Sequence, residues 1–254
     1  MIITNDTERT NLIEAGRRLA VVLEALRAKV APGVTSEELD NLAEQMIRDG
    51  GDEPCFLGYT PGGAGRPYPA TLCVSINDEV VHGIPNESVK TLKEGDIVGL
   101  DLGLRHRSIV VDAAITVPAG KTDEVSEKLM RATEMALLAG IAAAVPGNHI
   151  GDISQAIQKE IEDAGFKVVK ELGGHGVGDL IHEDPFIPNY GRAGEGELLS
   201  EGMVLALEPI ANAGRAAVVL APDGYTYRTK DGFRSAHFEH TILLQKGKAR
   251  IITI

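Results

Sequence analysis

Apolar positions recur every three or four residues near the start of the chain, and this spacing predicts an amphipathic helix over residues 8–30. Pro32-Gly33 ends the pattern. Thr35 stands three residues before Glu38, which is the signature of a capping box, and begins a second predicted helix that ends at Gly50-Gly51. The chain therefore opens with a helical hairpin.

Strand-like patterns follow this hairpin. Residues 58–69 are so rich in glycine and proline that we expect a mobile loop without regular structure. Alternation and β-branching predict a strand over 71–76. Two longer apolar runs, 97–104 and 108–117, predict a pair of strands joined by the short basic turn 105–107.

The second half of the chain repeats this plan. A predicted helix over 123–144 precedes Pro146-Gly147 and a further helix through Ile153 and Ile161. Pro146-Gly147 lies 114 residues after Pro32-Gly33, and the two helical hairpins end at the same offset. We therefore predict two similar halves within one domain, with a chance likeness between two amphipathic hairpins as the alternative.

The last third adds more predicted strands, at 203–210, 218–220, 225–227 and 235–244. If the two halves are duplicates, His82 before Gly-Ile-Pro and His182 before Glu-Asp-Pro face each other across the junction. Ligand clefts are common between such halves.

Composition narrows the class of protein. With 254 residues, 43% of them hydrophobic, the chain can bury a substantial core. A formal net charge of −12 argues against nucleic-acid binding, which depends on clustered Lys and Arg. Cys55 and Cys73 are too few for a disulfide framework, no apolar run is long enough to span a membrane, and the start lacks a signal-peptide pattern. We therefore expect a cytoplasmic protein without membrane contact.

An acidic residue interrupts each of four apolar runs, although a buried carboxylate is unfavourable unless it is paired, protonated or bound to a metal ion. A histidine flanked by glycines can join these acids because glycine allows close backbone approach, but such a histidine is also common in turns. Two bridged divalent cations suit four carboxylates and one imidazole, and the oxygen-rich, sulfur-free set favours Mn, Fe, Co or Zn. The alternative for any one acid is a solvated or salt-bridged position at a strand end. The candidate metal ligands are Asp101, Asp112, His175, Glu208 and Glu239.

Three other histidines, His82, His182 and His237, are candidates for groups just outside these ligands. There an imidazole can donate to a substrate carbonyl or a developing oxyanion, whereas the alternative for each is a solvent-facing or hydrogen-bonded histidine. Other chemistries fit less well, because no Gly-x-Ser-x-Gly elbow and no phosphate-binding loop is present, and the glycines around His175 are spaced wrongly for a dinucleotide.

At these residues the chain resembles the type I methionine aminopeptidases, which share their fold with creatinase and the proline aminopeptidases. The resemblance covers nearly the whole chain. The short interval from His175 to Glu208 lacks the insertion of the type II enzymes, and the larger proline-cleaving relatives have an additional N-terminal domain. The motifs that carry the resemblance are Asn77-Asp-Glu-Val-Val-His82-Gly-Ile-Pro, Gly95-Asp-Ile-Val-Gly-Leu-Asp101, Asp112-Ala-Ala-Ile-Thr, Gly174-His175-Gly-Val-Gly, His182-Glu-Asp-Pro, Gly202-Met-Val-Leu-Ala-Leu-Glu208-Pro and Glu239-His-Thr.

The resemblance implies an α+β pita-bread fold, in which two pseudo-symmetric halves form a curved antiparallel sheet covered by helices. Residues 1–254 would then be a single metallo-aminopeptidase catalytic domain. It also implies that Asp112 and Glu239 bridge two divalent ions, that Asp101 chelates one of them, and that His175 and Glu208 complete the other.

The activity that the resemblance implies is removal of the N-terminal methionine from peptides and nascent proteins. A hydroxide held between the metals would attack the scissile carbonyl, with Glu208 as the proton shuttle. His182 would steady the tetrahedral intermediate, and His82 would contact the substrate amide nitrogen. The substrate's free amine would bind a metal, which restricts cleavage to the N-terminus.

The expected side-chain pocket departs in part from the family pattern. Tyr59, Tyr68 and Cys73 fit the pattern. The loop over 58–69 is several residues longer than in common type I enzymes, and His237 stands where glutamine is usual. Where many members have cysteine, phenylalanine and tryptophan, this chain has Phe56, Ile181 and Tyr225.

These departures leave two alternatives open: a related metallopeptidase that prefers another first residue or an X-Pro bond, and a non-catalytic binding protein on the same fold. Loss of metal ligands would mark the second alternative, and none is lost here. The expected partners are the N-termini of peptides and nascent proteins, with the ribosome as a further candidate, and the expected state is a monomer.

Overall fold

The computed structural model describes residues 1–254, and its helices agree with the predicted helical hairpins. Three of the four helix N-termini are capped by the side chain of the N-cap residue. Asn5 accepts from the Glu8 amide, and Thr35 and Glu38 form the predicted capping box. In the second hairpin the Asp123 side chain accepts from the Ser126 amide. No helix is long and apolar enough to cross a membrane. The helices are α1 Asp6–Lys29, α2 Ser36–Asp49, α3 Glu124–Ala143 and α4 Ile150–Asp163.

A nine-stranded sheet forms the centre of the molecule. Its strands follow the order β1-β4-β5-β14-β9-β7-β8, with β2 on β4 and β15 on β14, and every pairing is antiparallel. These strands are β1 Glu53–Pro54, β2 Cys73–Ile76, β4 Ile97–His106, β5 Ile109–Pro118, β7 Gly173–Gly176, β8 Glu183–Pro188, β9 Val204–Leu207, β14 Glu239–Gln245 and β15 Lys248–Ile251.

Two three-stranded sheets flank the large one, with the orders β13-β10-β6 and β11-β12-β3. They carry the residues just before His82 and Glu239, so they help to set the direction of those side chains. The strands are β3 Glu79–Val81, β6 Lys167–Val168, β10 Ile210–Asn212, β11 Val218–Leu220, β12 Tyr227–Thr229 and β13 Ser235–His237.

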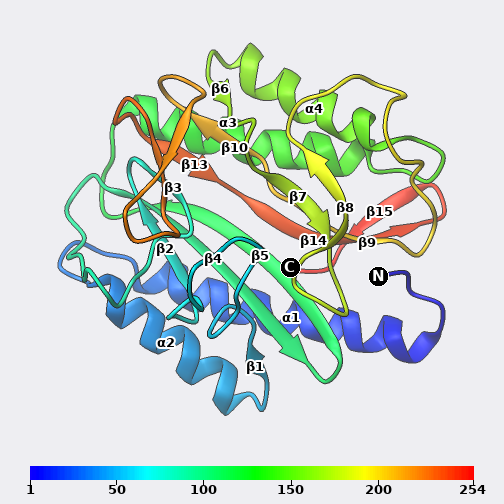
Figure 1. Ribbon diagram of the computed structural model, residues 1–254, viewed down its shortest axis with the longest axis horizontal. Helices are drawn as coiled ribbons and strands as arrows, with labels where there is room; N and C mark the ends of the chain where they lie inside the picture. The colour runs from blue at the N-terminus through cyan, green and yellow to red at the C-terminus, as the bar shows by residue number, and fades with distance from the viewer.

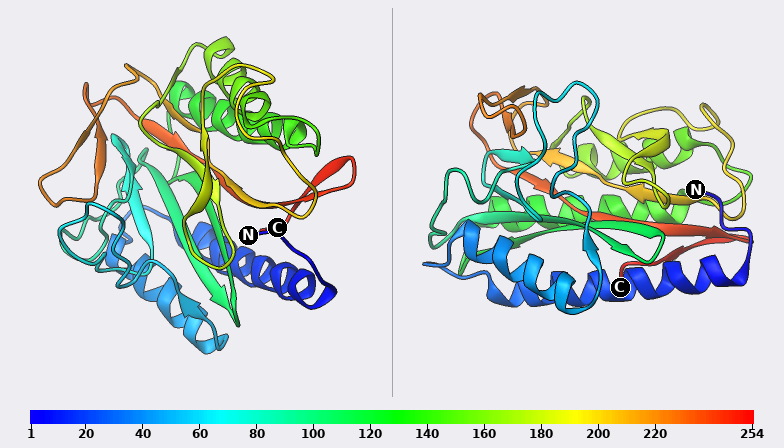
Figure 2. Two further views of the ribbon diagram at one scale, coloured as in Figure 1. Left: turned by 45° about the vertical axis from the view of Figure 1, so that its right-hand side comes forward. Right: turned by 60° about the horizontal axis from the view of Figure 1, so that its bottom comes forward.

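The two helical hairpins cover different parts of the large sheet (Figure 1). Helix α1 packs on β4 and β5, whereas α3 packs on β9, β14 and β15, and α4 packs on β8. In the second view of Figure 2, α1 and α2 lie below the sheet. The hydrophobic core therefore lies between the sheet and these helices, and the opposite side of the sheet is free to carry polar side chains.

Two predicted strands are each broken in the structure. The run 203–210 divides into β9 and β10 at Glu208-Pro209, because proline has no N–H to continue a ladder. The run 235–244 divides into β13 and β14 at Phe238. Both breaks lie beside an acidic candidate ligand, and they let its side chain leave the regular alternation of the sheet.

Two further predictions need correction, and one alternative that the sequence left open is excluded. The predicted strand at 225–227 begins only at Tyr227, because Asp223 Oδ1 accepts from the amides of Tyr225 and Thr226 and so holds them in a turn. The turn predicted over 105–107 is tighter, since β4 continues through His106 and Arg107 carries the turn with φ 56°. The glycines around His175 form strand β7 rather than a turn. The loop over 58–69 has no helix or strand, as predicted, and its mobility stays a prediction.

Candidate functional site

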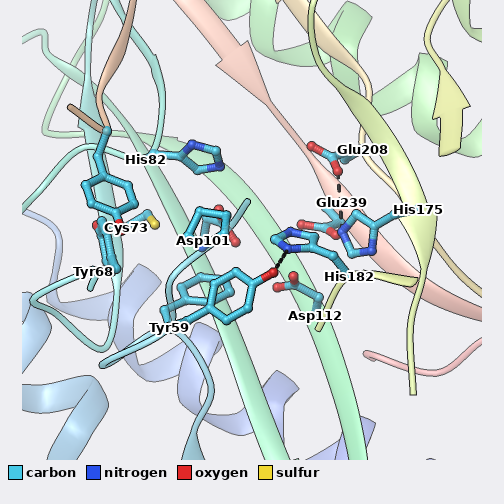
Figure 3. Close-up of a pocket in the computed structure, with 13 residues that line it drawn as sticks. Tyr59, Tyr68, Cys73, His82, Asp101, Asp112, His175, His182, Glu208 and Glu239 are labelled. Carbon is cyan, nitrogen blue, oxygen red and sulfur yellow. Dashed lines mark hydrogen bonds and ion pairs between the residues drawn. The ribbon is translucent and has the colours of Figure 1, made fainter. Parts of the chain in front are cut away.

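A cavity of ≈ 90 Å³ lies above the centre of the sheet, and twelve of the fourteen predicted site residues line it, all but Ile181 and His237 (Figure 3). Pro61 of the loop over 58–69 also lines it, and no chemical signal in the sequence pointed to this proline. The lining residues are Phe56, Tyr59, Pro61, Tyr68, Cys73, His82, Asp101, Asp112, His175, His182, Glu208, Tyr225 and Glu239.

Ile181 is the predicted pocket residue that does not line this cavity. It is buried, and a Cβ on Gly103 would meet both its Cδ1 and the Cε1 of Phe56 at 2.9 Å. Ile181 and Phe56 therefore both pack against the strand at Gly103. The assignment of Ile181 to the pocket surface is wrong, because the residues that line the cavity do not include it.

Strand register explains why three of the acids share one face. Asp101 of β4 lies opposite Ala114 of β5, and Asp112 lies opposite Gly103, so the two aspartates are diagonal neighbours. Glu239 begins β14 opposite the same Ala114. Because side chains alternate along a strand, all three carboxylates point to the same side of the sheet.

The remaining two candidate ligands come from the neighbouring strands. His175 of β7 pairs with Ala206 of β9, and Glu208 follows directly after β9. His175 Nε2 lies 3.6 Å from Glu208 Oε1. One ligand atom from each of Asp112, His175 and Glu239 lies within 4.8 Å of the other two.

Burial opposes ionisation of these acids. It raises the pKa of Asp112 to about 7, and it raises the pKa values of Asp101, Glu208 and Glu239 well above their usual range, with the neighbouring carboxylates adding to the effect. Asp101 Oδ1, Asp112 Oδ1 and Glu239 Oε1 are buried without a hydrogen-bond partner. Orphaned carboxylate oxygens that converge with an imidazole nitrogen fit a divalent cation, since two donors on opposite sides of such an ion lie about 4 Å apart.

Hydrogen bonding orients His175 for this task. Burial lowers its pKa to about 3, with nearby His182 as the second cause, so its imidazole is neutral. Nδ1 lies 2.9 Å from the Gly176 carbonyl oxygen, which accepts only, so Nδ1 carries the ring proton. Nε2 therefore presents its lone pair to the acids, as a metal-binding imidazole does.

His182 differs from His175 in its surroundings. It stands at the exposed rim of the cavity, and its Nδ1 is hydrogen-bonded to the hydroxyl of Tyr59 at 2.9 Å. Its ring lies 4.5 Å from that of His175 in an edge-to-face arrangement. Figure 3 shows Tyr59 reaching across the cavity to this ring.

His82 lines the same cavity in a strained backbone conformation. Its φ of 59° lies in the left-handed region, which costs a side chain other than glycine roughly 1 kcal/mol or more. Its ring packs edge-on to that of Tyr227 at 6.0 Å, and burial lowers its pKa to about 4. His82 and His182, which the repeat placed at one junction, both line this cavity.

A wider groove of ≈ 660 Å³ adjoins the cavity and was not predicted from the sequence. It shares His82, His175, His182 and Glu208 with the cavity, and it extends past the exposed side chains of Leu180 and Phe186. The polar cluster is therefore open on one side to an extended ligand.

A buried cluster of carboxylates and neutral imidazoles, set on a strongly bent antiparallel sheet, defines a metal-dependent hydrolase. The chain belongs to metallopeptidase family M24, whose model matches residues 10–246. The predicted α+β pita-bread fold and the metallo-aminopeptidase class are thereby confirmed.

Relatives and solved structures support this assignment. The chain is 43% identical to a methionine aminopeptidase of Aquifex aeolicus over 94% of this chain and 93% of the relative. It is 42% identical to the crystal structure of methionine aminopeptidase from Thermotoga maritima, with a TM-score of 0.94, over 100% of this chain and 99% of the other. A prolidase from Pyrococcus furiosus is 21% identical, with a TM-score of 0.74, over 100% of this chain and 65% of the other, and it shares the fold.

Proposed function

We propose that the protein is a methionine aminopeptidase, which hydrolyses the first peptide bond of peptides and nascent proteins that begin with methionine. The observation that carries this proposal is the convergence of four acids and the Nε2 lone pair of His175 beside a small, largely apolar cavity. The methionine aminopeptidases among the relatives support the choice of substrate.

Membership of the family implies that the protein uses a divalent metal. We propose two ions, Co, Mn, Fe or Zn, held by Asp101, Asp112, His175, Glu208 and Glu239. Four carboxylates at close range repel one another strongly, and two divalent cations offset that charge. When bound, such ions lower the pKa of water and polarise the scissile carbonyl.

Glu208 is suited to carry the proton that the reaction moves. Burial raises its pKa well above the usual range, and the charges of Asp101 and Asp112 add to the rise, which favours its carboxylate as a proton acceptor. Glu208 would take a proton as the carbonyl is attacked and give it to the departing amine.

His182 and His82 are suited to hold the scissile bond. With Tyr59 donating to Nδ1 of His182, its Nε2 carries the ring proton and can donate to the developing oxyanion. His82 would contact the substrate amide nitrogen. The division of roles follows from hydrogen bonding: His175 presents a lone pair, whereas His182 presents a proton.

The apolar wall of the cavity would hold the methionine side chain. Phe56, Tyr68 and Cys73 are buried, and Tyr225 packs edge-on to Tyr68 with ring centroids 5.1 Å apart. Burial raises the pKa of the Cys73 thiol far above its usual value, so this side chain acts as a small uncharged group. Tyr59 closes the cavity on the His182 side.

Metal-stripped protein is the starting point for the test. Mn, Co, Fe or Zn is restored in turn, and cleavage of Met-Ala-Ser, Leu-Ala-Ser and Met-Pro peptides is compared. We expect preferential cleavage of Met-Ala-Ser. No cleavage with any metal would refute the enzyme proposal. Preferential cleavage of the leucine or proline peptide would instead support one of the alternative specificities, for another first residue or for an X-Pro bond.

Ribosome association, a monomeric state and residence in the cytoplasm stay predictions. Co-sedimentation with ribosomes, sedimentation velocity and cell fractionation, respectively, would test them.

A further inference from the structure

His237 is held rigidly beside the acidic cluster without lining the cavity. It ends β13 opposite Ile210 of β10, and its side chain is buried, with 4% exposed. The Thr116 hydroxyl makes two bonds to it: the oxygen accepts from the His237 amide at 2.9 Å, and the hydroxyl donates to the His237 carbonyl at 2.7 Å. The backbone of His237 is therefore fixed beside the acids, and its side chain is enclosed.

The outer nitrogen of this ring has no hydrogen-bond partner. Nε2 of His237 is fully buried and lies 3.7 Å from Glu208 Oε2 and 3.9 Å from Glu239 Oε2. Both separations exceed a normal N–H···O bond by roughly 0.5 to 0.7 Å. A buried N–H without an acceptor costs about 1 to 3 kcal/mol, so a small rotation of either carboxylate toward Nε2 is favourable.

The chemistry of the neighbours indicates which ring nitrogen carries the proton. When Glu208 and Glu239 are ionised, as a bound cation requires, an unprotonated Nε2 would direct its lone pair at two carboxylates in a dry interior, which is repulsive. With the proton on Nε2, the ring offers a donor to both. Glu208 then lies between two imidazoles, since His175 Nε2 approaches Oε1 at 3.6 Å and His237 Nε2 approaches Oε2 at 3.7 Å.

We propose that His237 is a positioning residue of the metal site, which donates from Nε2 to the carboxylates of Glu208 and Glu239 and holds them ready for a divalent cation. It does not bind the cation itself. This inference rests on the proposed metal site and extends it, because it assigns a task to a residue outside the five candidate ligands.

Two physical effects follow from such a donor. Hydrogen bonding favours the ionised form of a carboxylate, and the cation requires that form. It also fixes the direction of the carboxylate, so that less conformational entropy is lost when the cation binds. Removing the donor should weaken metal binding without removing a ligand.

The test measures binding of Mn²⁺ to metal-stripped protein by titration calorimetry. Replacing His237 by leucine removes the donor, whereas glutamine keeps an N–H of similar reach. We expect His237→Leu to lower the affinity at least 10-fold and His237→Gln to stay within about 3-fold of the parent protein, in line with the usual effect of groups that support metal ligands. His240→Gln is the matched control, because its Nδ1 is bonded to Thr253 Oγ1 at 2.9 Å, away from the acids.

Thermal unfolding of the metal-free variants separates this effect from loss of fold. If His237→Leu does not fold, His237→Met replaces it with a more adaptable apolar side chain. Equal Mn²⁺ affinity in the parent and the leucine or methionine variant would refute the positioning proposal and leave the proposed function intact. A parent protein that binds no divalent ion would instead refute the proposed function.

The visible spectrum of the Co²⁺-loaded protein tests whether His237 is itself a ligand. Its bands depend on the donor atoms around the ion, so we expect the same band positions in the parent and His237→Gln. A shifted spectrum in His237→Gln, together with an unshifted one in His240→Gln, would show that the imidazole binds the metal and would overturn the assignment.

Discussion

Asp112→Asn should stabilise the metal-free protein while it weakens metal binding. The Asp112 side chain is almost fully buried, and its Oδ1 has no hydrogen-bond partner. Burial raises its pKa from 3.8 to about 7. When the pKa of an acid is higher in the folded than in the unfolded protein, its full contribution to folding stability is present only below the unfolded pKa. That contribution to stability is lost as the pH rises through the folded pKa.

The size of the effect follows from these two values. Between 3.8 and about 7 there are about three pH units, and at about 1.4 kcal/mol per unit the wild-type protein loses about 4 kcal/mol by pH 8. At pH 5 the loss is only about 2 kcal/mol. Asparagine does not ionise, so its advantage over aspartate should grow by about 2 to 3 kcal/mol between pH 5 and pH 8.

Loss of the Asp112 charge should increase the advantage of asparagine further. The charge of Asp112 raises the pKa values of Asp101, Glu208 and Glu239, so its removal also relieves those groups. The fixed cost of burying an amide in place of a carboxyl group cancels, because it is nearly the same at both pH values.

Urea unfolding of both proteins with a chelator present, at pH 5 and pH 8, measures this difference. Saturating Mn²⁺ should reverse the order at pH 8, because binding to the folded state stabilises only the protein that keeps its ligands. An advantage of asparagine that does not increase with pH would refute the claim that Asp112 is held in a costly, metal-ready position.

Four further variants separate the roles of the site residues. Glu208→Gln should lower kcat by 100-fold or more by removing the proton shuttle, and retained turnover of Met-Ala-Ser would contradict that role. His175→Ala and His182→Ala should both lower kcat, but only the first should also lower Mn²⁺ affinity strongly, and calorimetry that gives equal affinities would contradict the division of roles. Tyr59→Phe removes the bond that fixes the tautomer of His182, so kcat should fall several-fold to 10-fold with Mn²⁺ affinity unchanged. An unchanged kcat would show that this hydroxyl does not orient His182.

The sequence predicted the helices well because their signals are local. Helix α2 begins at the Thr35 capping box and ends at Gly50, since capping and apolar periodicity depend on residues a few positions apart. Strand ends were less predictable. The side chain of Asp223 accepts hydrogen bonds from the amides of Tyr225 and Thr226. Competition of this kind, between a side chain and a β-ladder for the same backbone amides, leaves only a weak signal in the sequence.

The candidate ligands could be selected from the sequence because buried charge has to be compensated. An acid inside an apolar strand, such as Asp101 or Glu239, is improbable unless a cation or a partner is nearby. The sequence alone did not show that Ile181 lies outside the cavity lining, because its place depends on packing against Gly103 on another strand.

The amino-acid sequence by itself determined where the helices and the main strands lie, though not where each strand ends, and which polar side chains have to share an interior, because periodicity and burial are properties of short segments. Only the tertiary structure decided how those side chains face one another. Pairing of β4 with β5 and of β5 with β14 brings the acids onto one face of the sheet. The Gly176 carbonyl only accepts and so places the ring proton of His175 on Nδ1, whereas Nδ1 of His182 faces the Tyr59 hydroxyl, which can donate to it.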